Sequence, residues 1–142
     1  MADTETAAAN EVVLRRWVES LNRGAPALAE TFAADAAVRL VGHPDVHDPP
    51  SFGAALGGLA AAFPDLRIEI VELSAEGDTV AFRWLGRGTH TGPLGAVAPT
   101  GRTVEFEGLI VDRLQGGKVV RRWEQYDRLW LLQQLGAAPD PR

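Results

Sequence analysis

Cysteine is absent from the 142-residue sequence, which excludes disulfide bonds, thiolate catalysis and cysteine-ligated metals. Serine is scarce: only Ser20, Ser51 and Ser74 occur, and none lies in the Gly-x-Ser-x-Gly motif of a hydrolase. No glycine-rich loop of the phosphate-binding kind follows a predicted strand and opens a helix. The sequence therefore predicts neither a serine hydrolase nor a nucleotide-dependent enzyme.

Positive charge is also scarce, since the formal net charge is -5 and Lys118 is the only lysine. Nucleic-acid binding needs a basic surface, and the pair Arg121-Arg122 is far short of one. No apolar run is long enough to cross a membrane, and the acidic residues 1–5 do not form a secretory signal. Together with the missing cysteines, this predicts a cytoplasmic protein without nucleic-acid or membrane partners.

The composition that remains is typical of one globular domain, with 46% hydrophobic and 23% charged residues. We expect a single domain over residues 1–142, with a core from about 8 to 137 and a loose tail over 138–142. A chain of this length buries enough surface to fold without a metal or a disulfide. No metal site is predicted.

Helices are predicted in the first half of the chain and strands in the second. Apolar residues at helical spacing, with Ser51 as a cap, predict helices over residues 7–21, 27–32 and 51–63. A short strand over 35–41 and a loop with three prolines over 42–50 lie between the last two. Alternating apolar residues predict strands over 66–70, 80–85, 104–110 and 117–126, followed by a short helix. This order indicates an α+β fold, and an antiparallel sheet curled around the helices would enclose a pocket.

The three histidines differ in their surroundings. His43 and His47 are four residues apart, but they lie in the proline-broken loop, so they share no helical face for a metal. His47 remains a candidate for the rim of a pocket. His90 continues the apolar alternation of Phe82 and Trp84, and it is either held by the following loop or exposed to a pocket.

Asp127 ends the last strand and precedes the last helix, which leaves two interpretations open. Aspartate is a favoured N-cap, and a capping carboxylate is stabilised in its ionised form by the helix N-terminus. A base that removes a proton from carbon works better when it is desolvated. Trp123 and Gln125 share the strand parity of Asp127, so without a bulge they would form a wall beside it.

Seven segments occur in an order and spacing that resemble the SnoaL-like polyketide cyclases. This family is a branch of the nuclear-transport-factor-like superfamily, which also includes ketosteroid isomerase and limonene epoxide hydrolase. The segments are AFPDL (62–66), EGD (76–78), GTHTG (88–92), PTGR (99–102), GKV (117–119), WEQYD (123–127) and QLG (134–136). The resemblance covers residues 8 to 137, while the segment 39–50 departs from the usual pattern near the pocket.

The resemblance implies a cone-shaped curved antiparallel sheet around helices, a deep apolar pocket and assembly into homodimers or larger homo-oligomers. It implies that Asp127 is the acid/base residue of a cofactor-independent cyclase, which removes a proton from a polyketide-like ester so that the enolate closes a ring. We assign His90 as a second catalytic residue. We assign substrate contacts to Trp123, Gln125, Tyr126, Trp84, Phe63 and His47, and the enolate donor is expected among His90, Gln125, Tyr126 and Trp123.

Two other functions remain open. Opening of an epoxide by water needs paired acids and an arginine; Arg83 and Arg121 are present, but no second inward acid is predicted. A non-catalytic module that binds a small molecule or forms dimers would have the same fold, because this fold hosts many functions.

Overall fold

The chain folds into a curved sheet with helices on its concave side, and the computed structural model describes residues 2–138. Residues 139–142 of the predicted tail lie outside the described residues. The elements are α1 (Ala2–Asn22), α2 (Leu28–Thr31), β1 (Phe32–Leu40), α3 (Pro49–Ala62), β2 (Arg67–Glu76), β3 (Thr79–Thr89), β4 (Thr103–Gln115), β5 (Lys118–Tyr126) and α4 (Arg128–Gln134). The predicted α+β class, with helices first and a closing helix last, is confirmed.

The sheet has the strand order β1-β5-β4-β3-β2. The strands β2 to β5 form an antiparallel meander, and Gly116 and Gly117 make its last turn with φ of 58° and 78°, which only glycine adopts readily. The strand β1 pairs with β5 in parallel. The sheet is therefore mixed rather than purely antiparallel, because the chain returns from β1 through α3 and the whole meander before it reaches β5.

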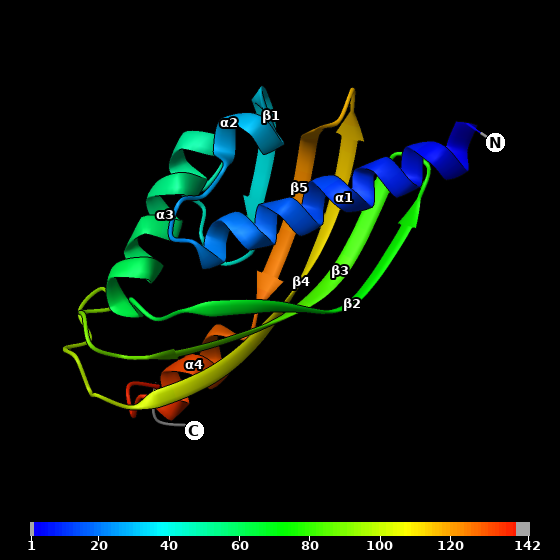
Figure 1. The fold of residues 1–142 in the computed structure, drawn as a ribbon. Helices are drawn as coiled ribbons and strands as arrows, with labels where there is room; N and C mark the ends of the chain where they lie inside the picture. The colour runs from blue at the N-terminus through cyan, green and yellow to red at the C-terminus, as the bar shows by residue number, and fades with distance from the viewer. Residues whose placement is uncertain (1, 139–142) are drawn as a thin grey trace.

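The helix α1 crosses the concave side over β2 and β3, while α3 lies near β1 and α4 packs on β4 (Figure 1). Leu14, Trp17 and Val18 form the buried face of α1. At the end of α1, the Asn22 side chain accepts a hydrogen bond from the Ile68 N–H (2.7 Å) and donates one to the Ile68 carbonyl (2.9 Å). This amide pairs with the free edge of β2 and fixes α1 over the sheet.

The helix α3 begins earlier than predicted. Asp48 is its N-cap and accepts from the Ser51 N–H (2.9 Å), while the Ser51 hydroxyl oxygen accepts from the Asp48 N–H (3.1 Å). The prediction that Ser51 itself caps the helix was therefore wrong by three positions. The physical reason is that Pro49 and Pro50 occupy the first turn, where their missing N–H groups need no partner.

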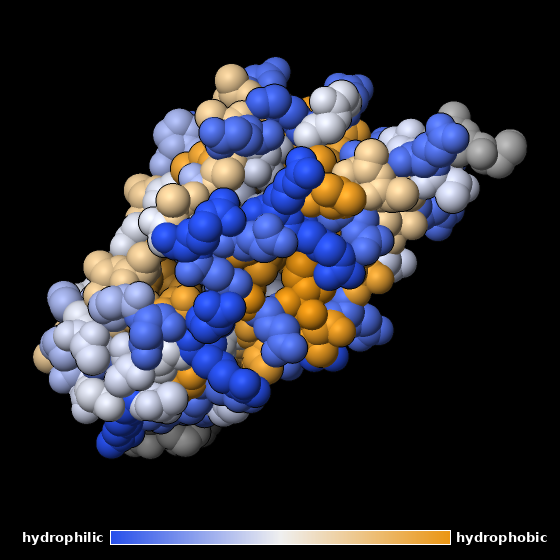
Figure 2. All heavy atoms as spheres, viewed as in Figure 1, coloured by the Kyte–Doolittle hydropathy of each residue, from blue (hydrophilic) through white to orange (hydrophobic). Residues whose placement is uncertain are grey.

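The core lies between the helices and the inner face of the sheet, where alternate residues of β3 and β4 are buried. Gly108 on β4 leaves space for the Trp84 indole, since a Cβ at Gly108 would come within 2.5 Å of that ring. On the side that carries α1, hydrophobic residues also reach the surface among hydrophilic ones (Figure 2). Within residues 2–138, no helix is both long and apolar enough to cross a membrane.

Candidate active site

A cavity of about 490 Å³ opens between the inner face of the sheet and the helices α1 and α3. Most of its wall is apolar, and Phe63 and Trp84 are part of it, as expected for two of the predicted substrate contacts. The other aromatic side chains of the wall are Trp17, Phe52 and Phe82. Arg122 and Glu124 bring charge into this apolar space.

Three ionisable side chains meet on the inner face of β4 and β5. The Arg122 guanidinium donates from Nε to Asp112 Oδ1 (2.8 Å) and from Nη2 to Asp112 Oδ2 (2.7 Å). Its third nitrogen, Nη1, lies 3.6 Å from Glu124 Oε1. The side chains of Asp112 and Arg122 are fully buried, so they hold each other without help from solvent.

Packing fixes Arg122 as firmly as its hydrogen bonds do. Its guanidinium carbon lies 5.4, 4.9 and 5.5 Å from the ring centres of Trp17, Phe32 and Phe52. Contacts of this kind stabilise a desolvated cation. Asp112 stands directly opposite Arg122 in the β4–β5 ladder, so the ion pair is built on rigid strands rather than on loops.

Glu124 is the acidic residue among those that line the cavity. Burial raises the pKa of its carboxyl to about 7, against the attraction of Arg122. Burial also raises the pKa of the Asp112 carboxyl, which Arg122 opposes. Because both oxygens of Asp112 are engaged by Arg122, Glu124 is the carboxyl of this group that can exchange a proton near neutral pH.

Buried polar atoms without a partner concentrate at this cavity. Among the described residues, four buried side-chain nitrogen or oxygen atoms have no hydrogen-bond partner: Trp84 Nε1, His90 Nε2, Arg122 Nη1 and Glu124 Oε1. All but His90 Nε2 belong to residues that line the cavity. Since buried polar groups are nearly always paired, the two donors and one acceptor left unpaired among these cavity-lining residues call for an explanation.

Asp127 does not reach the cavity. Its side chain is exposed, and Oδ1 accepts a hydrogen bond from the Trp130 N–H (3.0 Å) as the N-cap of α4. Trp123 and Gln125 are exposed on the outer face of β5. The expectation that these three residues form a wall facing the pocket is therefore corrected. Their side chains do point to the same side of β5, but that side is the outer face of the sheet.

His90 is buried, as its parity predicted, but it serves the loop between β3 and β4. Its Nδ1 accepts from the Thr100 N–H (3.1 Å) and lies 3.0 Å from the Thr100 hydroxyl. Its ring packs against Phe63 with the ring centres 5.4 Å apart. His90 does not line the cavity, so the prediction that it is a catalytic residue is corrected. The other interpretation, a histidine held by the following loop, agrees with the structure.

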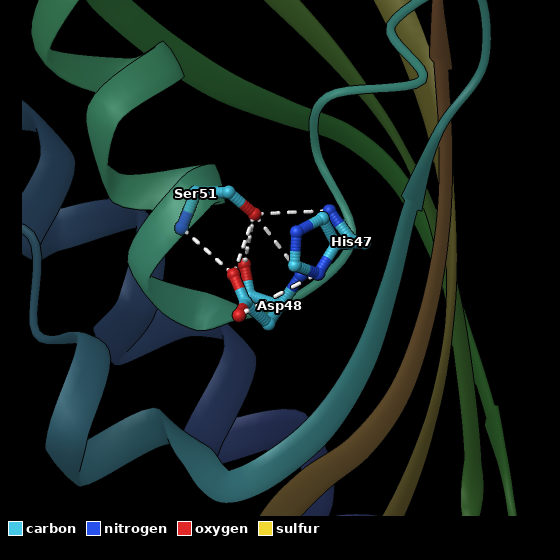
Figure 3. Close-up of polar contacts among 3 residues, drawn as sticks. All are labelled: His47, Asp48 and Ser51. Carbon is cyan, nitrogen blue, oxygen red and sulfur yellow. Dashed lines mark hydrogen bonds and ion pairs between the residues drawn. The ribbon is translucent and has the colours of Figure 1, made fainter.

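His47 and Tyr126 also lie away from the cavity wall. The His47 side chain is 71% exposed at the start of α3, and its backbone N–H donates to Ser51 Oγ at 2.9 Å (Figure 3). Tyr126 points inward on β5 and packs against Trp84, but its hydroxyl lies 3.0 Å from His43 Nε2. Neither side chain lines this cavity, whereas Tyr126 lines a separate hollow together with Gln125 and Asp127.

The sequence reasoning missed Asp112, Arg122 and Glu124. The expectation that no second inward acid exists is wrong, because Asp112 and Glu124 flank Arg122 on the inner face, whereas Arg83 and Arg121 are on the outer face. A signal was present: Asp112 continues the alternation of Val104, Phe106, Gly108 and Ile110. Among the described residues, no three histidine, aspartate or glutamate side chains gather as a metal site.

Comparisons with known proteins agree with this fold. The sequence model of the SnoaL-like polyketide cyclases matches residues 11–135. AclR from Streptomyces galilaeus, for which a hydroxylase activity has been suggested, is 28% identical with a TM-score of 0.84 over 96% of this chain and 90% of AclR. IdmH from Streptomyces antibioticus, a suggested polyketide cyclase, is 30% identical with a TM-score of 0.81 over 89% of this chain and 98% of IdmH.

A suggested polyketide cyclase from Acidithiobacillus ferrooxidans is 26% identical with a TM-score of 0.79, over 92% of this chain and 96% of that protein. A search among curated proteins gives no significant match.

Proposed function

Because the chain belongs to the SnoaL-like polyketide cyclase family, we propose that it is an acid/base enzyme that closes a ring on a small, polyketide-like substrate in the interior cavity. The observation that carries the proposal is the Glu124 carboxyl, which is buried, has a free oxygen and has a pKa of about 7. We assign Glu124 the proton-transfer role that the sequence resemblance gave to Asp127.

The proposed reaction begins at a carbon between two carbonyl groups. The Glu124 carboxylate takes a proton from this carbon, and the electron pair of the broken C–H bond moves to a carbonyl oxygen to form an enolate. The enolate carbon then attacks a ketone or aldehyde of the same molecule, so that a C–C bond forms and an alkoxide appears. Protonated Glu124 returns its proton to that alkoxide, which restores the carboxylate.

The enolate oxygen needs hydrogen-bond donors that stand ready before the reaction. Arg122 Nη1 and Trp84 Nε1 are buried, unpartnered donors of the cavity wall, and Arg122 Nη1 lies beside the Glu124 carboxyl. The apolar wall keeps both reacting ends of the substrate together and away from water, which supplies the advantage of an intramolecular reaction. No step in this scheme requires a cofactor.

The experiment uses ethyl benzoylacetate, a β-keto ester with one acidic methylene group. In D₂O the protein should accelerate exchange of the methylene hydrogens, followed by ¹H NMR. We expect Glu124→Gln to slow the catalysed exchange by roughly 10²–10⁴-fold, which is the usual contribution of a general base. Full exchange activity in Glu124→Gln would end the proposal.

Asp127→Asn is the matched control, because it removes the other carboxyl of this chain segment while asparagine still caps a helix well. We expect this variant to keep the exchange rate of the unchanged protein. Circular dichroism and the unfolding midpoint of both variants separate a chemical effect from a loss of fold.

A second candidate function is the opening of an epoxide by water, favoured by the two carboxyls that flank Arg122. In this reaction Glu124 would take a proton from water while the hydroxide attacks the epoxide carbon and the C–O bond breaks. The engagement of both Asp112 oxygens by Arg122 leaves Asp112 without a place to deliver the second proton, so this candidate ranks below ring closure. Turnover of styrene oxide in H₂¹⁸O, with ¹⁸O in the diol, would favour it.

We also propose that the chain forms a homodimer through the outer face of the sheet. Large apolar side chains lie exposed there, and Trp123 stands directly opposite Val111 in the β4–β5 ladder. Leu109, 59% exposed, extends this patch along β4. Contiguous apolar surface of this kind marks an interaction site more often than it marks free surface.

A further inference from the structure

Gly57 on α3 presents backbone without a side chain to the cavity. It is one of the residues that line the cavity, and a Cβ built on it would meet no atom within 4 Å. The next residue, Gly58, also has open space around its missing Cβ, and both glycines are exposed, but Gly58 does not line the cavity. The two glycines are therefore equally free of neighbouring atoms, and they differ in that only Gly57 lines the cavity.

Packing does not explain the glycine at position 57. Glycine in the interior of a helix is less favourable than alanine, so a reason for it has to be sought in the surroundings. At Gly53 the reason is visible, because a Cβ there would come within 2.7 Å of Leu28 Cδ1. Gly58 shows that a helical glycine alone does not indicate a ligand; Gly57 differs because it is one of the residues that line the cavity.

A second observation supports a ligand in this cavity. Glu124 Oε1 and Trp84 Nε1 are buried side-chain atoms without partners, in side chains that line the same cavity. Glu124 is 9% exposed and Trp84 5% exposed. Such atoms are costly to bury unless something binds them, and a ligand with a carbonyl or hydroxyl group supplies both a donor and an acceptor.

We infer that Gly57 determines the width of the ligand that the cavity admits. The polar end of the ligand reaches Glu124 and Trp84, and a flat apolar group lies against the backbone of α3 at Gly57. The inference rests on the proposed function only in taking this cavity as the ligand site. Substituting Gly57 with a larger residue puts a side chain where the apolar group would lie.

The test measures binding of N-phenyl-1-naphthylamine, a flat neutral dye that fluoresces in apolar cavities, to the whole protein. We expect Gly57→Leu to weaken binding about tenfold or more, as overfilling of a packed site does, and Gly57→Ala to weaken it less. Gly58→Leu is the matched control and should bind like the unchanged protein. Both leucine variants should unfold at higher temperature, because leucine favours the helix more than glycine does.

Equal binding by Gly57→Leu and the unchanged protein would overturn the inference. Equal weakening in Gly58→Leu would also overturn it, because the effect would then come from the helix and not from the cavity. Failure of the unchanged protein to bind the dye counts against the inference as well, since a cavity open at Gly57 must admit it. Dye binding does not depend on proton transfer, so a failed exchange assay with Glu124→Gln leaves this result standing.

Discussion

Glu124 and Asp127 are two carboxyl groups only three residues apart, and their surroundings differ in every respect that matters for chemistry. Glu124 lies inside the sheet with a free oxygen next to Arg122, and its pKa is about 7. Asp127 lies outside, exposed, and its carboxylate receives the Trp130 N–H as a helix cap. The same functional group therefore has the surroundings that we propose for proton transfer in one place and caps a helix in the other, and the direction of the side chain decides which.

The two faces of β5 extend this comparison. The inner face carries the charges of Arg122 and Glu124, whereas the outer face exposes Trp123. This reverses the common pattern of apolar side chains inside and charged ones outside. Buried charge persists here because Asp112 and the aromatic rings around Arg122 replace the lost water.

The largest loss of stability is expected when the positive charge at the centre of the inner face is removed. Arg122→Met leaves Asp112 and Glu124 buried without a counter-charge, so we expect a loss of about 3–5 kcal/mol in the free energy of unfolding, measured with urea. Arg121→Met is the matched control one position away; its guanidinium lies on the exposed Trp123 ring, and we expect a change within about 0.5–1 kcal/mol. Equal losses in both variants would contradict the contrast between the faces.

A pH series sharpens the comparison without changing Arg122. The pKa of Glu124 is raised from 4.5 to about 7 in the folded protein, so folding favours its protonated form. The resulting stability is fully present below pH 4.5 and is lost as pH rises through 7, up to about 3 kcal/mol for this shift. The unchanged protein and the variant Glu124→Gln both contain Arg122 and Asp112, the charged groups that act on this carboxyl. The difference in stability between the two proteins therefore reports the titration of the Glu124 carboxyl.

We therefore expect Glu124→Gln to gain stability relative to the unchanged protein between pH 5 and pH 8, as measured by urea unfolding at each pH. Proton-transfer activity should rise over the same interval, because the carboxylate is the active form. A stability difference that stays constant with pH would mean that the Glu124 carboxyl titrates normally.

A smaller effect is expected on the outer side. Asp127→Ala removes the cap of α4, and we expect it to destabilise the protein by about 1 kcal/mol in thermal unfolding while the exchange reaction continues. Asp127→Asn should recover most of this stability. If Asp127→Ala instead abolished exchange in a folded protein, the carboxyl outside the cavity would have a chemical role after all.

The smallest change in monomer stability is expected at Trp123, which is 38% exposed. Trp123→Arg should change the free energy of unfolding of the monomer by no more than about 0.5 kcal/mol but place a charge in the apolar outer patch. Sedimentation of the unchanged protein should show a dimer, and this variant should shift it toward the monomer. A monomeric unchanged protein would remove the proposed role of the outer face.

The sequence was sufficient for most helices and strands because local patterns agree with the tertiary structure there. Helical spacing predicted α1 and α3, period-two alternation predicted β3 and β4, and two adjacent glycines predicted the last hairpin. The parallel pairing of β1 with β5 was missed, because no local pattern specifies a neighbour so distant along the chain.

The site was predicted less well, and the reason is the usual assumption that apolar residues face inward. On β5 this assumption turned Trp123 toward the pocket, whereas the register of the β4–β5 ladder shifts between Arg113 and Leu114 and places Arg122 and Glu124 inside. The alternation of buried residues along β4 would have placed the Asp112 side chain inside. A buried aspartate is unfavourable without a partner, however, and the sequence did not reveal that Arg122 is this partner.

The parallel pairing of β1 with β5 has a consequence for how the protein folds. Leu40 of β1 pairs with Glu124, 84 positions further along the chain, and β5 is the strand that joins β1 to the rest of the sheet. Closing such a long loop is entropically costly, so we expect β1 to join after the meander from β2 to β5 has formed. The strand β1 would then be the last part of the sheet to become rigid, and hydrogen exchange should show β1 and the β5 edge facing it opening before β3 and β4.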